Sequence, residues 1–116
     1  MHKLIFCTFS IEGFHLWKEA SAYSSEEYLA SKHRHMFYFK CSASVIDSDR
    51  EIEFISMGRA IKDYLESTYG HPCDFNNMSC EKIAELVIIF MRSKYGERRY
   101  SVTVLEDNEN GSMVFD

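Results

Sequence analysis

Hydrophobic and polar residues alternate with a period of two near both ends of the chain, and a helical period lies between them. The runs KLIFCTFS (3–10) and HMFYFKCSASVI (35–46) are rich in β-branched and aromatic residues, which predicts two strands. YSVTVLE (100–106) and SMVFD (112–116) predict two more, separated by DNENG, whose Asn-Gly step is typical of a hairpin turn. We therefore expect two pairs of neighbouring strands.

The second predicted strand has one apolar face. Because side chains alternate between the faces of a strand, every second residue after the first histidine points to the same side. We expect the core to cover the face that carries His35, Phe37, Phe39, Cys41, Ala43 and Val45.

The middle of the chain predicts two helices. From Phe54 the apolar residues fall at helical spacing up to a stop at Gly70, and a second helix begins after Ser79, a good N-cap, and ends at Gly96. The apolar faces are expected to contain Met57, Ile61, Tyr64, Leu65 and Thr68 in the first helix and Ile83, Val87, Phe90 and Met91 in the second.

The predicted order is strand, strand, helix, helix, strand, strand, which is an α+β arrangement. A four-stranded antiparallel sheet with both helices on one face would bury all the apolar stripes. Residues 18–32 are polar and rich in serine, so we expect a long loop there with a helical turn at SEEYLA (25–30). We expect residues 1–116 to form a single domain.

Composition and charge exclude several classes of protein. The 116 residues carry a net charge of −5, which argues against general nucleic-acid binding. The longest apolar run, LVIIFM, is too short to span a membrane. The four cysteines form no Cys-x-x-Cys pair, and the first residues show no small-residue cleavage site. We therefore expect a cytoplasmic protein with reduced thiols.

Three histidines suggest a metal site. His33 and His35 point to the same face of a strand, with Cα atoms about 6.5–7 Å apart, and the first hairpin would bring His15 beside them. Three imidazoles suit a catalytic zinc, which keeps a fourth position open. The pair alone is more typical of polar residues at a strand edge, and His15 shifts the balance towards a site.

A further alternative is that the histidines bind no metal and contact a phosphate or a ring directly. Arg34 lies between two of them in the sequence, which is compatible with a phosphate ligand. In a regular strand, however, Arg34 points to the opposite face, so we do not expect it to share their ligand.

Several motifs, in their order along the chain, resemble the 6-pyruvoyl-tetrahydropterin synthase and 6-carboxytetrahydropterin synthase family. They are a first strand ending F-x-x-x-x-F-H, the run HRHMFYF at the second strand, EFISMGRAI entering the first helix, MSCEKIAELV at the second helix and VTVLED at the third strand. Departures within them include Glu53, which stands where the family has Asp. The resemblance covers nearly the whole chain.

The resemblance implies a T-fold, which has the strand and helix order predicted above. It also implies that His15, His33 and His35 hold zinc and that Glu106 anchors a pterin. T-fold subunits join their sheets edge to edge and bind ligands between subunits, so a homo-oligomer is expected. A planar pterin, purine or nucleotide ligand suits a carboxylate anchor and aromatic stacking.

The chain departs from the family at the residues of catalysis. The family has a catalytic Cys in the loop before His-x-His, and residues 18–32 contain none. The family also has an Asp-His pair between the helices, whereas here His71 and Asp74 are not adjacent. Tyr23 or His71 could act as the general base in place of the family's residues. The sequence assigns no catalytic residue, so it does not decide whether the protein is an enzyme.

Two hypotheses follow. One is an enzyme acting on a reduced pterin or a related purine-derived compound with the help of zinc. The alternative is a non-catalytic protein that sequesters a nucleotide and counters host nucleotide signalling, as a phage or mobile-element protein of this size would. That alternative rests on the size and general character of the chain rather than on a particular residue.

Three further residues are candidates for ligand binding. Trp17 follows His15 closely, and stacking on a ligand and packing in the core are equally compatible with its position. Arg50 lies in DSDREIEF, which is more typical of a turn and a solvated edge, but it could pair an anionic group at the cavity. His71 completes the set.

Overall fold

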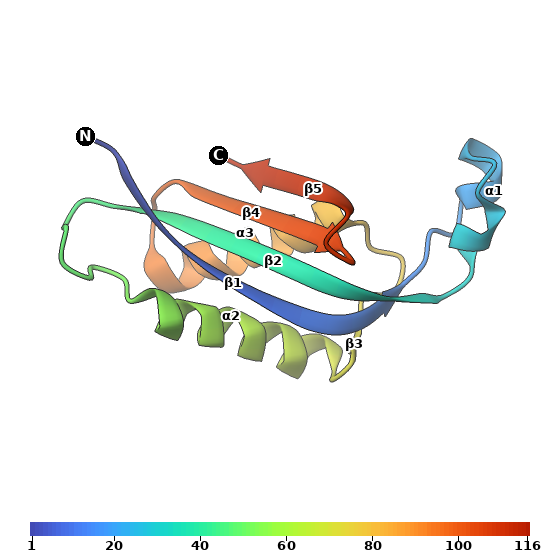
Figure 1. The fold of residues 1–116 in the computed structure, drawn as a ribbon, viewed down its shortest axis with the longest axis horizontal. Coiled ribbons are helices and arrows are strands. Elements are labelled where there is room, and N and C mark those ends of the chain that lie inside the picture. Colours follow the sequence, from blue (N-terminus) through green and yellow to red (C-terminus); the bar gives the residue numbers. More distant parts are fainter.

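A computed structural model describes residues 1–116 as one sheet with two long helices and a small lobe (Figure 1). The strands are β1 (Lys3–His15), β2 (His33–Val45), β3 (Cys73–Asp74), β4 (Tyr100–Glu106) and β5 (Asn110–Phe115). The long helices are α2 (Phe54–Tyr69) and α3 (Cys80–Tyr95). The connection between β1 and β2 contains the short helix α1 (Ala20–Tyr23) and the 3₁₀ turn η1 (Glu27–Ala30). The predicted α+β class is confirmed.

The sheet has one strand more than predicted. Its order is β3-β1-β2-β4-β5, and β1, β2, β4 and β5 pair antiparallel as expected. The additional strand β3 runs parallel to β1, opposite Gly13 and Phe14. A strand of two residues has no hydrophobic period, so the sequence pattern could not indicate it. Backbone hydrogen bonds from Phe75 to Phe14 and from Leu16 to Asn76 hold this segment against β1.

Strand β1 extends beyond the predicted run 3–10 and reaches His15. A glycine interrupts the hydrophobic alternation at position 13, where a Cβ would lie 3.0 Å from the ring of Phe75 and 3.1 Å from that of Phe37. The missing side chain therefore makes room for two aromatic rings. The extension places His15 directly opposite His33.

Both long helices cover the same face of the sheet. The buried hydrophobic residues of β1, β2 and β4 belong to a single core cluster with those of α2 and α3. The sheet residues in that cluster all lie on the face predicted from β2, so the prediction of an apolar inner face is confirmed. These buried residues of β2 are Phe37, Phe39, Cys41, Ala43 and Val45.

The helix boundaries follow their capping residues. Glu53 accepts hydrogen bonds from the backbone N–H groups of Ile55 and Ser56 at the start of α2, and Ser79 accepts one from Lys82 at the start of α3. Both helices end at a glycine with a positive φ, 94° at Gly70 and 88° at Gly96. No helix combines the length and the apolarity that crossing a membrane requires.

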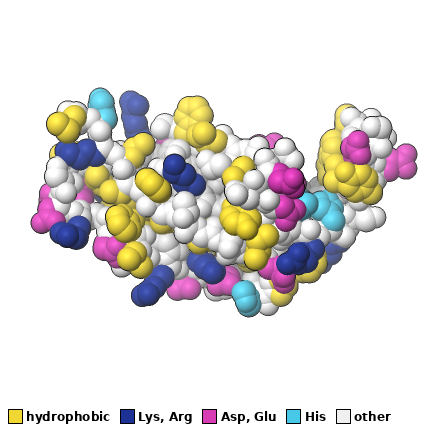
Figure 2. Space-filling model, viewed as in Figure 1, with side chains coloured by type: hydrophobic (Ala, Val, Ile, Leu, Met, Phe, Trp, Pro, Cys, Tyr) yellow, Lys and Arg dark blue, Asp and Glu magenta, His cyan; other side chains and the backbone are white.

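The connection between β1 and β2 forms a lobe, residues 16–32, that projects from the end of the sheet (Figure 1). The expected loop with a helical turn is present as η1, and α1 adds a second turn. Figure 2 shows hydrophobic side chains gathered on this lobe, with a hollow between it and the body of the molecule. The lobe therefore stands beside the end of the sheet that carries the histidines.

Candidate functional site

The three histidines meet where β1 ends and β2 begins. His15 and His33 are direct partners across the two strands, and His35 follows on the same face. One ring nitrogen from each of the three lies within 4.8 Å of the other two. The predicted cluster is therefore formed, and antiparallel pairing of two strands is enough to form it.

The Nδ1 atom of each histidine has a partner of its own. Nδ1 of His15 lies 2.9 Å from the carbonyl oxygen of Met78, and Nδ1 of His33 lies 2.8 Å from that of Ser31. Because a carbonyl oxygen only accepts, these two Nδ1 atoms carry the proton. Nδ1 of His35 lies 2.7 Å from the carboxylate of Asp107. This pattern leaves the Nε2 atoms as ligands, and it is the arrangement that usually orients metal-binding imidazoles.

Glu106 at the end of β4 faces the cluster. Its carboxylate lies 2.9 Å from Nε2 of His15 and 3.4 Å from Nε2 of His35. Since Nδ1 of His15 already donates to a carbonyl, Nε2 can meet this carboxylate only by carrying a second proton. Without a metal, this contact therefore favours the imidazolium form of His15.

The ionisation of these groups agrees with that geometry. Burial lowers the pKa of His15, but its hydrogen bonds to Glu106 and Met78 and the charge of Glu106 outweigh burial and raise it overall. The hydrogen bond from His15 lowers the pKa of Glu106 against the effect of burial. The backbone N–H of Met36 and the imidazole of His35 lower the pKa of Asp107. Two carboxylates thus give the cluster a negative environment that favours a cation.

A polar atom of the cluster lacks a hydrogen-bond partner. Nε2 of His35 is buried and makes no hydrogen bond; it meets only the carboxylate of Glu106, at 3.4 Å. Leaving such a group unpaired costs about 1–3 kcal/mol. A metal ion held by the three Nε2 atoms would satisfy it and would replace the second proton of His15. The donor set therefore fits a nitrogen-preferring ion such as zinc.

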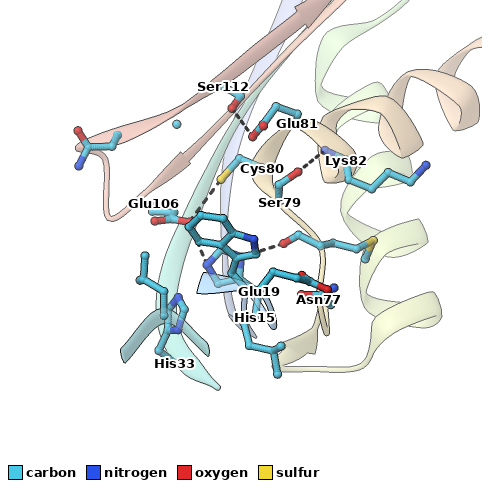
Figure 3. A pocket seen from close by; sticks show the side chains of 16 residues that line it. His15, Glu19, His33, Asn77, Ser79, Cys80, Glu81, Lys82, Glu106 and Ser112 are labelled. Carbon is cyan, nitrogen blue, oxygen red and sulfur yellow. Dashed lines mark hydrogen bonds and ion pairs between the residues drawn. The ribbon is translucent and has the colours of Figure 1, made fainter. Parts of the chain in front are cut away.

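A cavity of about 670 Å³ adjoins the cluster, as Figure 3 shows. His15, His33 and Glu106 line one side, and the start of α3 lines another. The side chain of Trp17 also lines the cavity and is 37% exposed, so it is not a core residue. The cavity is large enough for a small planar ligand.

The start of α3 brings a thiol and a carboxylate to the cavity. The Cys80 thiol lies 3.7 Å from Glu106, and burial followed by the charge of Glu106 raises the pKa of Cys80 to about 12. Glu81 accepts a hydrogen bond of 2.7 Å from Ser112 of β5. The cavity wall therefore links α3 to both β4 and β5.

Two predicted ligand-binding residues lie away from this cavity. Arg50 follows β2, at the opposite end of that strand from the histidines, where it pairs with Asp49 and is 80% exposed. His71 is exposed and pairs with Glu66 of α2. Neither lines the cavity. Arg34 pairs with Glu12 on the other face of the sheet, as predicted from strand alternation.

Some residues of the site are not evident from sequence reasoning. Asp107 lies in the turn after β4 with a positive φ of 54°, and the sequence indicates only a turn there. Its position directly after Glu106 was the one available signal. The carbonyl oxygens of Met78 and Ser31 belong to loops whose paths only the tertiary structure defines.

Neither the protein-family models nor the curated proteins include a match to this chain.

Proposed function

We propose that this protein binds zinc at His15, His33 and His35 and uses the site to hold a pterin- or purine-type ligand in the adjoining cavity. We infer that it is a divergent relative of the 6-pyruvoyl-tetrahydropterin synthase T-fold proteins. The observation that carries the proposal is the buried Nε2 of His35, which makes no hydrogen bond, in a cluster whose Nδ1 atoms are all engaged.

Three neutral imidazoles are a common ligand set for catalytic zinc, which keeps one coordination position for water or substrate. Bound there, zinc would polarise an oxygen atom of the ligand. The protein residues orient the site: Asp107 and two backbone carbonyl groups hold the rings by their Nδ1 atoms. His33 lines the cavity, so the open position would face it.

Glu106 is the proposed anchor for the ligand. A glutamate side chain is ordinarily ionised at neutral pH, and a carboxylate can accept two N–H groups from the edge of a pterin or purine ring. When a metal ion replaces the second proton of His15, Glu106 loses that hydrogen bond and can accept from the ligand instead. Trp17 offers an indole at the same cavity for stacking.

A second candidate is binding without turnover, as in a protein that sequesters a nucleotide. The chemistry of Cys80 favours it. Cys80 is the one thiol that lines the cavity, and a pKa of about 12 keeps it protonated. A protonated thiol is a poor nucleophile and a poor base. The cavity therefore has binding groups without an activated cysteine.

We also propose a homo-oligomer assembled through sheet edges. Strand β3 pairs only with Gly13 and Phe14, so the rest of β1 has an open edge, and β5 forms the other edge of the sheet. Two exposed hydrophobic residues, Met113 and Phe115, lie on β5. Open edges of this length usually pair with another chain or are protected. We place the assembly in the cytoplasm, since all four cysteines are free thiols.

The proposal is tested by titrating neopterin into the full chain loaded with zinc and into the same chain after chelation. Binding is followed by calorimetry, with Glu106→Gln as the variant that keeps shape and loses charge. We expect binding that needs zinc and that weakens at least tenfold in Glu106→Gln. Equal binding with and without zinc would contradict the proposal.

Turnover separates the two candidates. A dihydroneopterin-type substrate incubated with the zinc-loaded protein is followed by chromatography, and nucleotides that copurify with the protein are identified by mass spectrometry. Product formation that requires His33 and His35 supports the enzyme. A tightly bound, unchanged nucleotide supports sequestration. Light scattering of the same sample gives the mass of the assembly, and a monomer would contradict edge pairing.

A further inference from the structure

Two cysteines face each other across β1 and β2, away from the histidine cluster. Cys7 and Cys41 are direct partners in the antiparallel register and point to the face that the helices cover. Both are free thiols, with Cys41 buried and Cys7 partly exposed. Neither takes part in the zinc site or in the cavity beside it.

The backbone places the two residues within reach of a disulfide. Asp107 donates its N–H to the carbonyl of Met36, and Ser44 donates to that of Arg99, so the even-numbered residues of β2 bond towards β4. The odd-numbered residues, Cys41 among them, therefore bond towards β1. In such a hydrogen-bonded pair the Cα atoms lie about 5.5 Å apart. Disulfides span Cα distances of about 4.4–6.8 Å.

Solvent has a route to one member of the pair. Cys7 lines a second cavity, of about 620 Å³, between β1 and the first turns of α2. Gly58 of α2 stands beside it, where a Cβ would lie 3.4 Å from the Cys7 sulfur. The glycine therefore lets α2 pack close to the thiol, and an added methyl group there would crowd the Cys7 sulfur. Cys41 lies deeper and does not line this cavity.

The two thiols also differ in ionisation. A hydrogen bond from the Cys41 thiol lowers the pKa of Cys7, although burial opposes this effect. The same contact and burial raise the pKa of Cys41. Cys7 is therefore the member that ionises first, and Cys41 is the member that keeps its proton.

We propose that Cys7 and Cys41 form an oxidation site for small peroxides, in which Cys7 is attacked first and Cys41 closes a reversible disulfide. The Cys7 thiolate attacks one oxygen of hydrogen peroxide and breaks the O–O bond. Cys7 becomes a sulfenic acid, and the other oxygen leaves as hydroxide and takes up the proton that the Cys7 thiol gave up.

In the second step the sulfur of Cys41 attacks the sulfur of Cys7 and breaks its S–O bond. The hydroxyl group leaves as a second water molecule with the proton of Cys41. The sulfur pair loses two electrons, and the peroxide gains them. Two molecules of a small thiol such as glutathione reduce the disulfide by exchange, which returns both protein thiols and leaves glutathione disulfide.

The test treats the reduced full chain with hydrogen peroxide and maps the disulfides after blocking free thiols and digesting with trypsin. Cleavage after lysine and arginine puts Cys7 in peptide 4–18, Cys41 in peptide 41–50, and both other cysteines in peptide 63–82. We expect peptides 4–18 and 41–50 to be linked, and the link to disappear after reduction. Failure to link them in the folded wild type would overturn the proposal.

Three variants resolve the order of the steps. Cys41→Ser should accumulate sulfenic acid at Cys7, trapped by dimedone, while Cys7→Ser should leave Cys41 unmodified. Gly58→Ala should slow the formation of the link in a chain that keeps both cysteines. The matched control Cys73→Ser/Cys80→Ser should form the link at the wild-type rate. Equal oxidation of Cys41 in Cys7→Ser would contradict the assignment of Cys7 as the first thiol.

Discussion

The two ends of strand β2 hold charged side chains in opposite ways. Beyond Val45, Glu51 accepts from the backbone N–H groups of Ile46 and Asp47, each at 2.9 Å, and from Arg98 at 2.6 Å. Arg98 donates in addition to backbone carbonyl oxygens, so both charges are fully paired. At the histidine end, by contrast, two carboxylates face three imidazoles and a buried ring nitrogen makes no hydrogen bond.

The difference separates a structural network from a candidate binding site. Where donors and acceptors balance, as around Arg98, nothing remains for a ligand and the network fixes the loop after β2. Where they do not balance, as around His35, the fold holds polar groups in place for something else. Imbalance in a buried cluster is therefore the stronger indication of function, compared with charge alone.

The largest effect is expected from Phe37→Ala, which removes the apolar support of the histidines. The Phe37 ring is fully buried and packs edge to face on His15 and His35. Truncation should cost about 3–5 kcal/mol of stability and weaken zinc binding as well. Phe39→Ala is the matched control: it should destabilise similarly, as measured by urea unfolding, but leave zinc affinity unchanged in the folded protein. Equal zinc affinity in both variants would contradict this role of Phe37.

Asp107→Asn tests the histidine end of β2 with a smaller change. The variant keeps an oxygen for the N–H of Met36 but weakens the charged contact to Nδ1 of His35. Losing such a partner typically lowers metal affinity about 10–100-fold. Glu51→Gln, at the other end, should lower stability and leave zinc affinity at the wild-type value. Calorimetric zinc titration of both variants measures the difference.

The stabilising network at one end of β2 and zinc binding at the other end should also be lost at different pH values. Hydrogen bonds from Asp47 and Ile46, with Arg98, lower the pKa of Glu51 from 4.5 to about 2. A carboxylate whose pKa is lower in the folded protein than in the unfolded chain stabilises the fold at pH values above its unfolded pKa. This contribution is therefore lost as the pH falls from 4.5 towards 2. Zinc should leave at a higher pH than this, because protons compete with the metal for the imidazole nitrogens.

The measurement is thermal unfolding and retained zinc as functions of pH, for the wild type and for Glu51→Gln. The variant should lose the part of the acid-dependent stability that Glu51 contributes and should release zinc at the same pH as the wild type. Zinc that stays bound down to the pH at which the fold is lost would contradict histidine ligation.

The smallest effect is expected at Arg50. Arg50→Ala removes an exposed side chain that contacts only its neighbour Asp49. Stability should change by less than about 0.5 kcal/mol, and zinc and ligand binding should be unchanged. A tenfold loss of ligand affinity would mean that Arg50 reaches a site in another subunit.

Sequence patterns predicted the long elements well, because their periods extend over many residues. The second strand, both helices and their capping residues Ser79, Gly70 and Gly96 were all evident. Short features were not. Strand β3 has two residues and depends on contacts with the end of β1, and Gly13 concealed the continuation of β1 to His15.

The site was predicted where the spacing of side chains along strands defines it. The alternation in β2 placed His33 and His35 on one face, and the hairpin brought His15 to them. Arg50 was a candidate for ligand binding because of its chemistry, although its segment is more typical of a turn, and its place in the chain puts it at the other end of β2. The partners of Nδ1 are two backbone carbonyl groups and a turn residue, which side-chain patterns do not encode.

The most direct test of zinc binding at the three histidines is the metal content of the full chain, purified without a histidine tag, before and after equilibration with zinc. Elemental analysis should find about one zinc ion per chain, bound by three imidazoles, and none in His33→Ala/His35→Ala. Circular dichroism of the variant confirms that it is folded. A folded wild type that stays free of metal after equilibration with zinc would contradict the proposed zinc site at the three histidines.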